Sequence, residues 1–409
     1  MSELSYLKKL LNGVEVEWKA LGEVCDFKNG FAFKSSLFKE AGLPIIRITN
    51  VDGKNISLDD VKYFDPSDYK ENTASYEISK GDILIAMSGA TTGKIGFYAH
   101  ESPAYLNQRV GKFLPKPKIL NNRYLYHYLL SKVEQIYVIA GGGAQPNLSS
   151  NALMAKIEIP ILYPDNPEKS LAIQAEIVRI LDTFTALTAE LTAELTARKK
   201  QYNYYRDQLL SFNDGKVEWK TLGEIAGYSK ARISFDKLNE NNYVGVDNLL
   251  QNRAGKTLSN YLPTSGNLTK FDIGDILIGN IRPYLKKIWQ SDCVGGTNGD
   301  VLVIHCSDSS VCSRYLYQVL ADDAFFEYNM QHAKGAKMPR GNKEAILKYS
   351  VPVPSVTEQT RIVSILDKFD ALTNSITEGL PREIELRQKQ YEYYRDLLFS
   401  FPEPESVNN

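Results

Sequence analysis

The chain carries one helical sequence twice, and this repeat limits the possible folds more than any other feature. The segment QAEIVRILDTFTALT at 174–188 returns as QTRIVSILDKFDALT at 359–373, with 10 of 15 positions identical. The segment from Glu194 to Phe212 returns between Glu383 and Phe401, with 12 of 19 positions identical. Chance does not produce matches of this length, so we expect two copies of one structural unit in a single polypeptide.

The repeat also covers short segments outside these helices. The segments VEWK, GDILI and RYLY each occur once in each half, starting at 16 and 217, 81 and 274, and 123 and 314. By contrast, the halves have little in common between 26 and 79 or between 227 and 272. Each half is therefore predicted to be a domain with a shared framework and its own surface, followed by a long helix. Such a chain is expected to bind something with approximate two-fold symmetry.

Short β-branched runs bounded by Gly, Pro or Asn predict strands in both domains. Helices are expected at 122–139 and 313–329. The predicted fold class is therefore α+β, with two mixed α/β domains joined by two long antiparallel coiled-coil helices. The predicted strands lie at 82–87, 94–99, 110–114, 156–161, 275–279, 286–289 and 301–305.

Apolar residues in the first long helix recur at alternating spacings of four and three, as coiled-coil packing requires. The alternation slips at the tandem TAEL sequence of 188–195, and the second helix is expected to stop and restart at Gly379 and Pro381. A helix of roughly 40 residues spans ~60 Å, so the pair would hold the domains a fixed distance apart. An ordinary helical hairpin inside one fold is the alternative. The positions predicted to pack between the helices are Ile173, Ile177, Ile180, Phe184, Leu187, Leu191, Leu195, Ile362, Phe369, Leu372 and Ile376.

Composition fits a soluble globular protein of two domains. The 409 residues exceed one ordinary core, and the net charge of −1 does not by itself indicate a nucleic-acid binder. No run approaches the ~18 apolar residues of a membrane helix, and a signal peptide pattern is absent, so a cytoplasmic location is expected. The four cysteines include no CxxC pair and the four histidines are scattered. Neither disulfides nor a metal site is therefore expected.

The segment SGATTGK at 88–94 resembles a phosphate-binding loop but fails the test for one. Three residues separate Gly89 from Gly93 where the motif needs four, and Ile95 stands where Ser or Thr would hold magnesium. No other catalytic motif is recognised in the sequence. The chain is therefore predicted not to be catalytic and to bind no cofactor of its own.

Polar loops bounded by glycine carry the groups that suit DNA contacts in both domains. Amide, hydroxyl and guanidinium groups match base edges, and lysines match phosphates. The loops lie at 29–36, 88–94 and 141–150 in the first domain and at 279–287, 295–300 and 334–343 in the second. The predicted DNA-binding residues are Lys34, Ser35, Arg47, Ser88, Thr91, Thr92, Lys94, Asn107, Gln108, Arg109, Gln145, Asn147, Asn280, Arg282, Tyr284, Lys286, Lys287, Thr297, Asn298, Lys334, Lys337, Arg340 and Lys343.

These features resemble the specificity subunits of type I restriction-modification enzymes. The resemblance rests on the opening NGFAFKSS, the GDILI framework strand, the QxEIVxILD helix start and the YYRDxLLSF helix end, and it covers nearly the whole chain. The TAEL repeat and PDNPEKSLAIQ at 164–174 are similar to the IC group of that family.

The resemblance implies that each domain reads one half of a split DNA site, while the helices set the spacing and dock two methyltransferase subunits. Motor-nuclease subunits would join later, and S-adenosylmethionine, ATP and magnesium would be used by the partners. Half-sites one turn apart, ~10 bp centre to centre, would leave an undefined spacer of ~6–7 bp. The chain would then divide into a segment at 1–12 packing near the C-terminal helix, recognition domains at 13–163 and 214–353, spacer helices at 164–213 and 354–401, and a disordered tail at 402–409.

Two other functions remain open on the sequence alone. A coiled-coil adaptor would join two partner proteins without reading DNA, and its polar loops would then be idle. A nucleotide-using enzyme would bind ATP or S-adenosylmethionine as an isolated chain.

Overall fold

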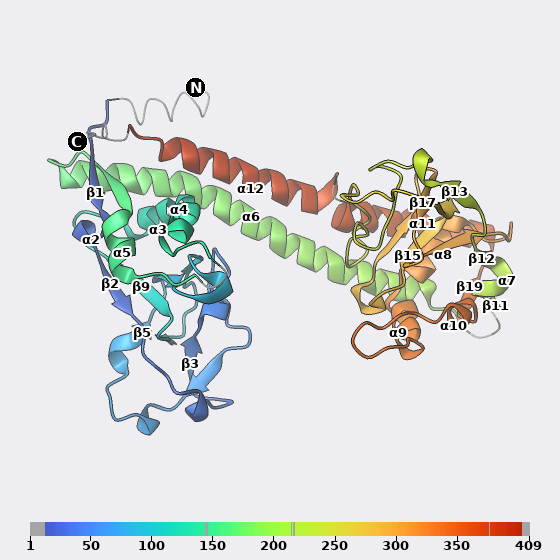
Figure 1. Ribbon diagram of the computed structural model, residues 1–409, viewed down its shortest axis with the longest axis horizontal. Coiled ribbons are helices and arrows are strands. Elements are labelled where there is room, and N and C mark those ends of the chain that lie inside the picture. Colours follow the sequence, from blue (N-terminus) through green and yellow to red (C-terminus); the bar gives the residue numbers. More distant parts are fainter. Residues whose placement is uncertain (1–12, 144–145, 214, 216, 376, 403–409) are drawn as a thin grey trace. The chain divides into compact units, whose positions relative to one another are not determined.

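The computed structural model describes residues 13–143, 146–213, 215, 217–375 and 377–402, which form two compact units (Figure 1). Unit 1 comprises the described residues up to Leu187 together with those from Gln388 onward, and unit 2 comprises those from Thr188 to Arg387. The predictions for segment 1–12, for the tail beyond Pro402, for Gln145 and for Ile376 lie outside the described residues. No helix in the described ranges is long and apolar enough to cross a membrane.

Unit 1 is built on two four-stranded sheets. Its strands are β1 (Val16–Ala20), β2 (Cys25–Asn29), β3 (Leu43–Ile46), β4 (Lys62–Phe64), β5 (Glu77–Ile78), β6 (Ile83–Ala86), β7 (Ile95–Phe97), β8 (Ala104–Leu106), β9 (Val110–Pro115) and β10 (Glu158–Leu162). Its shorter helices are α2 (Leu21–Val24), α3 (Asn122–Ser131), α4 (Val133–Ile139) and α5 (Ser150–Lys156). One sheet has the antiparallel order β2-β9-β6-β7, the other has the order β4-β3-β8-β5, and β1 pairs with β10.

Unit 2 repeats this framework. Its strands are β11 (Glu218–Thr221), β12 (Ala226–Tyr228), β13 (Arg232–Ser234), β14 (Asn267–Phe271), β15 (Ile276–Gly279), β16 (Ile288–Gln290), β17 (Gly295–Thr297), β18 (Val301–Cys306) and β19 (Ser350–Val353). Its shorter helices are α7 (Leu222–Ile225), α8 (Ser313–Leu320), α9 (Asp323–Gln331) and α10 (Lys343–Leu347). The order β12-β18-β15-β16 matches β2-β9-β6-β7, and the β11-β19 ladder matches β1-β10. The predicted α+β class and internal repeat are confirmed.

The GDILI segment supplies the central strand of each larger sheet, and burial on both faces explains its unbroken apolar character. In β6, Ile83 and Ile85 face the helix-covered core, while Leu84 packs into a second cluster on the other face. In β15, Ile276 and Ile278 likewise face one cluster and Leu277 the other. The strand therefore needs no polar face.

Long helices connect the units. Helix α6 (Pro167–Leu210) is continuous over 44 residues and passes from unit 1 into unit 2. The second long segment is divided into α11 (Val356–Asn374) and α12 (Gly379–Leu398), and α12 passes back from unit 2 into unit 1. Gly379 has φ +74°, and a Cβ there would lie 2.4 Å from the carbonyl oxygen of Ala371. The predicted stop and restart is therefore confirmed, and glycine is required at that point.

The predicted helix-packing residues differ in burial. Ile177 and Ile362 are fully buried, and so is Leu181, which the predicted stripe omitted. The ring of Phe184 stacks on Tyr394 in unit 1 with centroids 5.1 Å apart. The remaining predicted positions are half-buried, namely Ile173, Ile180, Leu187, Leu191, Leu195, Phe369 and Leu372.

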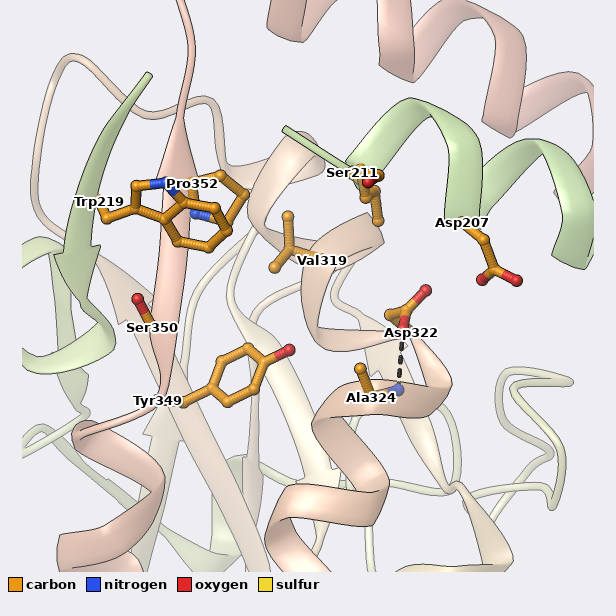
Figure 2. Close-up of a pocket in the computed structure, with 10 residues that line it drawn as sticks. Asp207, Ser211, Trp219, Val319, Asp322, Ala324, Tyr349, Ser350 and Pro352 are labelled. Atoms are coloured by element: carbon orange, nitrogen blue, oxygen red, sulfur yellow. Dashed lines mark hydrogen bonds between the residues drawn. The ribbon is translucent and has the colours of Figure 1, made fainter. Parts of the chain in front are cut away.

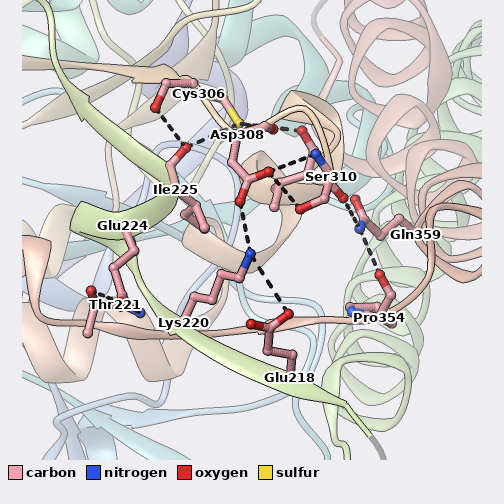
Figure 3. A network of polar contacts seen from close by, with 12 residues as sticks. Glu218, Lys220, Thr221, Glu224, Ile225, Cys306, Asp308, Ser310, Pro354 and Gln359 are labelled. Atoms are coloured by element: carbon pink, nitrogen blue, oxygen red, sulfur yellow. Dashed lines mark hydrogen bonds and ion pairs between the residues drawn. The ribbon is translucent and has the colours of Figure 1, made fainter.

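A buried glutamine ties each long helix to its domain, which explains why the repeated helical motif begins with Gln. In unit 1 the Oε1 of Gln174 accepts a hydrogen bond from the backbone N–H of Asn121 at 2.8 Å. In unit 2 the Oε1 of Gln359 accepts from the N–H of Cys312 at 2.8 Å, and its Nε2 donates to the carbonyl of Ser310 at 2.8 Å (Figure 3). Each glutamine satisfies backbone groups just before the domain helix.

In the same region of unit 2, Lys220 of the VEWK segment connects the start of the domain to the loop after β18 through ion pairs. Figure 3 shows its ammonium between Asp308 at 3.0 Å and Glu218 at 3.8 Å. Hydrogen bonds from Ser310, together with the one from Lys220, lower the pKa of Asp308 to about 2. The carboxylate is therefore ionised throughout the physiological range and fixes the loop after β18.

A buried polar relay joins α3, α6 and α12 in unit 1. One imidazole nitrogen of His127, Nε2, lies 2.8 Å from Oδ1 of Asp182, and the other, Nδ1, lies 2.9 Å from the hydroxyl of Tyr391. Burial lowers the pKa of His127, so the ring is neutral near pH 7. Because an ionised carboxylate only accepts, Nε2 carries the hydrogen and Nδ1 accepts from Tyr391.

Unit 2 makes the same relay with a different residue. Gln318 occupies the place of His127, its Nε2 donates to Asp367 at 2.7 Å, and its Oε1 accepts from the hydroxyl of Tyr202 at 3.2 Å. A glutamine amide offers one donor and one acceptor in the same sense as the neutral imidazole. An arginine from the RYLY segment pairs with the carboxylate in both units, Arg123 with Asp182 and Arg314 with Asp367.

The single domain helix expected in each half was wrong, because each is broken in two. Helix α3 gives way to α4 at Lys132, and α8 gives way to α9 at Asp322, whose carboxylate caps the new helix by accepting from the N–H of Ala324 at 2.8 Å. Apolar periodicity continues through both breaks and conceals them. The carbonyls released there are satisfied by the arginine of each YYRD motif.

These arginines complete the connection between long helix and domain. Arg395 of α12 donates to the carbonyl of Leu130 at 3.1 Å, and Arg206 of α6 donates to the carbonyl of Ala321 at 3.3 Å. Arg206 is itself buried, over the ring of Tyr202. The arginine of each YYRD motif is therefore a structural contact within its unit.

Candidate nucleic-acid interface

Three loops of unit 1 meet at the end of β6. The backbone N–H of Met87 donates to the carbonyl of Arg109 at 2.8 Å, and the N–H of Leu148 donates to the carbonyl of Met87 at 2.7 Å. The N–H of Gly89 donates to the carbonyl of Pro146 at 3.3 Å. We call this arrangement of loops 87–94, 107–109 and 146–150 loop site 1.

Loop site 1 surrounds an open hollow of about 830 Å³ with a polar lining. The hydroxyl oxygen of Ser88 is buried and has no hydrogen-bond partner among the described residues. Gln108, Arg109 and Asn147 are exposed around it. The site thus gathers hydroxyl, amide and guanidinium groups on a backbone held by hydrogen bonds, as base-edge recognition requires.

Unit 2 repeats the three backbone hydrogen bonds at equivalent positions. The N–H of Asn280 donates to the carbonyl of Asp300 at 2.8 Å, and the N–H of Gly341 donates to the carbonyl of Asn280 at 3.1 Å. The N–H of Arg282 donates to the carbonyl of Pro339 at 2.8 Å. We call the arrangement of loops 280–287, 298–300 and 334–342 loop site 2.

The two loop sites share a backbone but differ in side chains. Gly89 has φ +79°, and its equivalent is Arg282 with φ +52°. Gly93 has φ +83°, and its equivalent is Lys286 with φ +51°. Unit 2 therefore keeps long cationic side chains in a left-handed conformation that favours glycine, a form of strain that often accompanies function.

Some predicted contact residues of unit 1 have their polar groups engaged inside the fold. The hydroxyl of Thr91 donates to the carbonyl of Ile48 at 3.1 Å, and that of Thr92 donates to the carbonyl of Gly89 at 2.7 Å. The guanidinium of Arg47 donates to the carbonyl of Asp60 at 2.7 Å. These side chains shape the loops and are poorly placed to contact a ligand as well.

Other predicted residues of unit 1 lie beside loop site 1. Asn107 precedes Gln108 and pairs with Phe31, and Lys94 is half-buried at the end of its loop. Lys34 and Ser35 are exposed in the separate loop before β3, and neither lines the hollow.

The predicted residues of unit 2 also divide into engaged and exposed groups. Lys286 pairs with Asp323 at 2.7 Å, and Lys287 donates to the carbonyl of Val246 at 2.6 Å while burial lowers its pKa. The hydroxyl of Thr297 is fully buried and donates to the carbonyl of Val244. Asn298 accepts from the N–H of Asp300 at 3.0 Å, whereas Asn280 belongs to neither group, because it is buried with its Oδ1 lacking a hydrogen-bond partner among the described residues. The exposed members are Arg282, Tyr284, Lys334, Lys337, Arg340 and Lys343.

Ion pairs within the fold neutralise some of the basic residues near loop site 1. Between Asn107 and Arg123 the chain has five basic residues and no acidic one, but Lys112 pairs with Asp82 at 2.9 Å, and Arg123 belongs to the helix relay. Arg109 makes no ion pair within the described part of the chain. Sequence reasoning missed the contribution of Asn29, whose Nδ2 donates to Ser150 at 3.4 Å on the lining of the hollow. The signal for it was its place at the start of the 29–36 loop.

A second hollow, of about 320 Å³, lies in unit 2 between the end of α6, the β11-β19 ladder and the break between α8 and α9 (Figure 2). Trp219, Val319 and Tyr349 form its apolar walls, and Asp207 and Asp322 stand at one side. Burial raises the pKa of Asp322. Among the described residues no hydrogen bond joins the lining serines, Ser211 and Ser350, to either carboxylate, and the mainly apolar walls distinguish this hollow from the loop sites.

Unit 1 fills the equivalent space with aromatic side chains. Phe399 packs edge-on against Tyr124 and Tyr128, with centroids 5.1 and 5.3 Å apart. The indole N–H of Trp18 donates to the carbonyl of Pro402 at 2.8 Å. Smaller residues at two of these places, such as Val319 for Tyr128, leave the hollow in unit 2.

Comparison with known proteins gives a consistent result. The family described as Type I restriction modification DNA specificity domain matches residues 13–198 and 215–386. The specificity subunit of the type I restriction enzyme EcoR124I/EcoR124II from Escherichia coli is 39% identical over 429 residues, covering 100% of each chain. The EcoprrI specificity subunit from Escherichia coli is 33% identical and covers 92% of this chain and 93% of its own length.

A solved structure has a similar fold. The crystal structure of the type I restriction-modification system S subunit from M. genitalium matches with a TM-score of 0.57 at 17% identity. The match covers 96% of this chain and 98% of the other. The similarity therefore extends over both units and the long helices.

Proposed function

Because the chain belongs to the family of type I restriction-modification DNA specificity subunits, we propose that its two loop sites each read one half of a bipartite DNA sequence. The observation that carries this proposal is the repetition of three backbone hydrogen bonds in loop sites whose side chains differ. The shared backbone would hold the side chains that contact bases at equivalent positions in both units, and the different side chains would select different bases.

The exposed cations support contact with DNA phosphates. Lys334 and Lys337 lie on the 334–342 loop of loop site 2, Lys343 follows it as the first residue of α10, and all three are exposed. Lysines at the rim of such a surface attract the phosphate backbone without regard to sequence. Base selection would then rest on the inner groups of each site.

The long helices carry a matched pair of exposed aromatic residues that suits two copies of one partner. Tyr204 of α6 is 60% exposed, and its repeat equivalent Tyr393 of α12 is 58% exposed. Each stands edge-on to the next tyrosine in its motif. Exposed aromatic residues are frequent anchors at protein interfaces, so we assign to this pair the docking of two methyltransferase subunits.

Catalysis belongs to the partner subunits in this proposal. Methyl transfer from S-adenosylmethionine and ATP-dependent cleavage with magnesium would be theirs, and motor-nuclease subunits would join the assembly. The 88–94 segment supports this division, since Thr91 and Thr92 turn their hydroxyls to backbone carbonyls. The recognition domains would correspond to 13–163 and 214–353, with the spacer helices setting a gap of ~6–7 bp between half-sites.

The decisive experiment is to co-express the chain with the methyltransferase subunit of its operon and sequence methylated adenines genome-wide. A split motif with a fixed gap near 6 or 7 bp is expected. A Y204A/Y393A variant should lose methylation because the partners no longer dock, while the chain stays folded by circular dichroism. No motif, or one continuous motif, from the wild-type complex would instead favour an adaptor that does not read DNA.

A further inference from the structure

The loop sites differ in side-chain charge at two equivalent positions. Loop site 1 has Arg109 where loop site 2 has Asp300, and it has Asn147 where loop site 2 has Arg340. The equivalence follows from the backbone, since Ser88 bridges to Asn147 as Ile281 bridges to Arg340. At these two positions each site therefore carries one arginine, but from a different loop; loop site 2 has a further arginine, Arg282, in its 280–287 loop.

The arginines also differ in what holds them. Nη1 of Arg340 donates to Oδ1 of Asp300 at 2.7 Å. Arg109 has no carboxylate partner in the ranges that the structure describes, and it lines the hollow together with the amide side chains of Gln108 and Asn147. The guanidinium of Arg340 is thus fixed by a charged hydrogen bond, and that of Arg109 is not.

Fold stability does not explain the pair in loop site 2. The side chains of Arg340 and Asp300 are 52% and 34% exposed, and ion pairs as exposed as this one contribute little to stability. A carboxylate on a surface that contacts phosphates also weakens binding. If the carboxylate instead orients the guanidinium group of Arg340 for contact with a planar acceptor, its presence is explained despite its small effect on stability and its unfavourable charge beside phosphates.

We propose that Arg109 and Arg340 each read a guanine in their own half-site, and that Asp300 is a positioning residue for Arg340. This inference rests on the proposed function, because it names the reading groups within the same loop sites. Guanine presents two acceptors, N7 and O6, on its major-groove edge, and an arginine fork matches both. Because amides line the hollow with Arg109 and a carboxylate pairs with Arg340, the two half-sites should differ in the bases preferred next to the guanine.

The test compares the methylation motifs of single variants in the complex with the methyltransferase subunit. The R109A variant is expected to relax one guanine position in one half-site, with the other half-site unchanged, and R340A should do the reverse. The D300N variant keeps Arg340 and the side-chain size, and it should relax the same position as R340A. Loss of one bidentate contact corresponds to a roughly 5- to 150-fold loss of discrimination against other bases.

A matched control and a binding assay keep the outcomes separate. The K337A variant removes an exposed cation from the same loop as Arg340, and it should weaken binding evenly for all sequences. If a variant methylates too little DNA for its motif to be identified, the DNA affinity of its complex is measured instead. The complex is titrated at low salt with DNA duplexes that differ at single bases. Even weakening in R109A and R340A would overturn the inference, as would a D300N motif identical to that of the wild type. A wild-type complex without a split motif would overturn the proposed function itself.

Discussion

Replacement of His127 tests whether the buried relay depends on its hydrogen bonds or on the packing of the imidazole ring. The variant H127Q places in unit 1 the residue that unit 2 uses, and Gln318 makes the same two bonds at 2.7 and 3.2 Å. We expect the free energy of unfolding to change by about 1 kcal/mol or less at pH 7.5, because no buried group loses its partner. The matched variant H127L removes both bonds and leaves the Tyr391 hydroxyl unpaired in the core. Its expected cost is about 2–5 kcal/mol.

The pH dependence supplies a second and sharper measure. Burial lowers the folded-state pKa of His127, so as pH falls the unfolded chain binds its proton first. The stabilisation is therefore fully present above the unfolded pKa of about 6.5 and is lost as pH falls through the folded pKa. Between pH 7.5 and 5.5 the wild type should lose at most about 1.4 kcal/mol through this residue. Although burial raises the pKa of Asp182, its hydrogen bonds outweigh that effect and lower it, so this carboxyl titrates below the window.

Urea denaturation of the full-length chain at both pH values measures these quantities. The difference between wild type and H127Q isolates the contribution of the relay. We expect H127Q to lose less stability than the wild type on acidification. A variant H127Q as unstable as H127L at pH 7.5 would refute the reasoning, since it would mean that ring packing and not the donor–acceptor pattern holds the relay.

Three further changes test other parts of the structure. Insertion of a third TAEL after 188–195 should lengthen α6 by ~6 Å and widen the methylated motif by one to two undefined base pairs; an unchanged gap would contradict the spacer role. The variant R282G should raise stability by roughly 1 kcal/mol because it relieves left-handed strain, and should weaken DNA binding in a filter assay. The same change at Lys286 should not stabilise, because its ion pair with Asp323 is lost. The variant N329L should stabilise unit 2 by about 1–3 kcal/mol in thermal unfolding, since Nδ2 and Oδ1 of Asn329 are buried without a partner among the described residues; a loss would indicate that water occupies the site.

The sequence predicted the framework well because the framework is what the repeat preserves. The central strands, the long helix and its interruption at Gly379 all recur or follow from local chemistry. The break at Lys132 was not predictable from apolar spacing, because a guanidinium from α12, far away in sequence, satisfies the carbonyl of Leu130. Local patterns do not report partners that come from distant segments.

The candidate site was predicted less completely for a similar reason. Of the residues predicted from their type to contact DNA, Ser88 and Arg109 line the polar hollow. It could not distinguish them from Thr91 or Arg47, whose polar groups bond to backbone carbonyls that only the fold brings near. Whether a hydroxyl faces a ligand or its own loop depends on tertiary contacts.

The two units serve as internal controls for one another, and their differences separate structural from selective chemistry. Where His127 is replaced by Gln318, the donor, the acceptor and both partners are retained, so the pattern of bonds is the feature that the fold needs. Where Arg109 is replaced by Asp300, the backbone bond is retained but the sign of the side-chain charge is reversed. A fold that holds its helices and loops by conserved hydrogen bonds and leaves its loop side chains free to change charge can change what each loop site contacts without altering the framework of either unit.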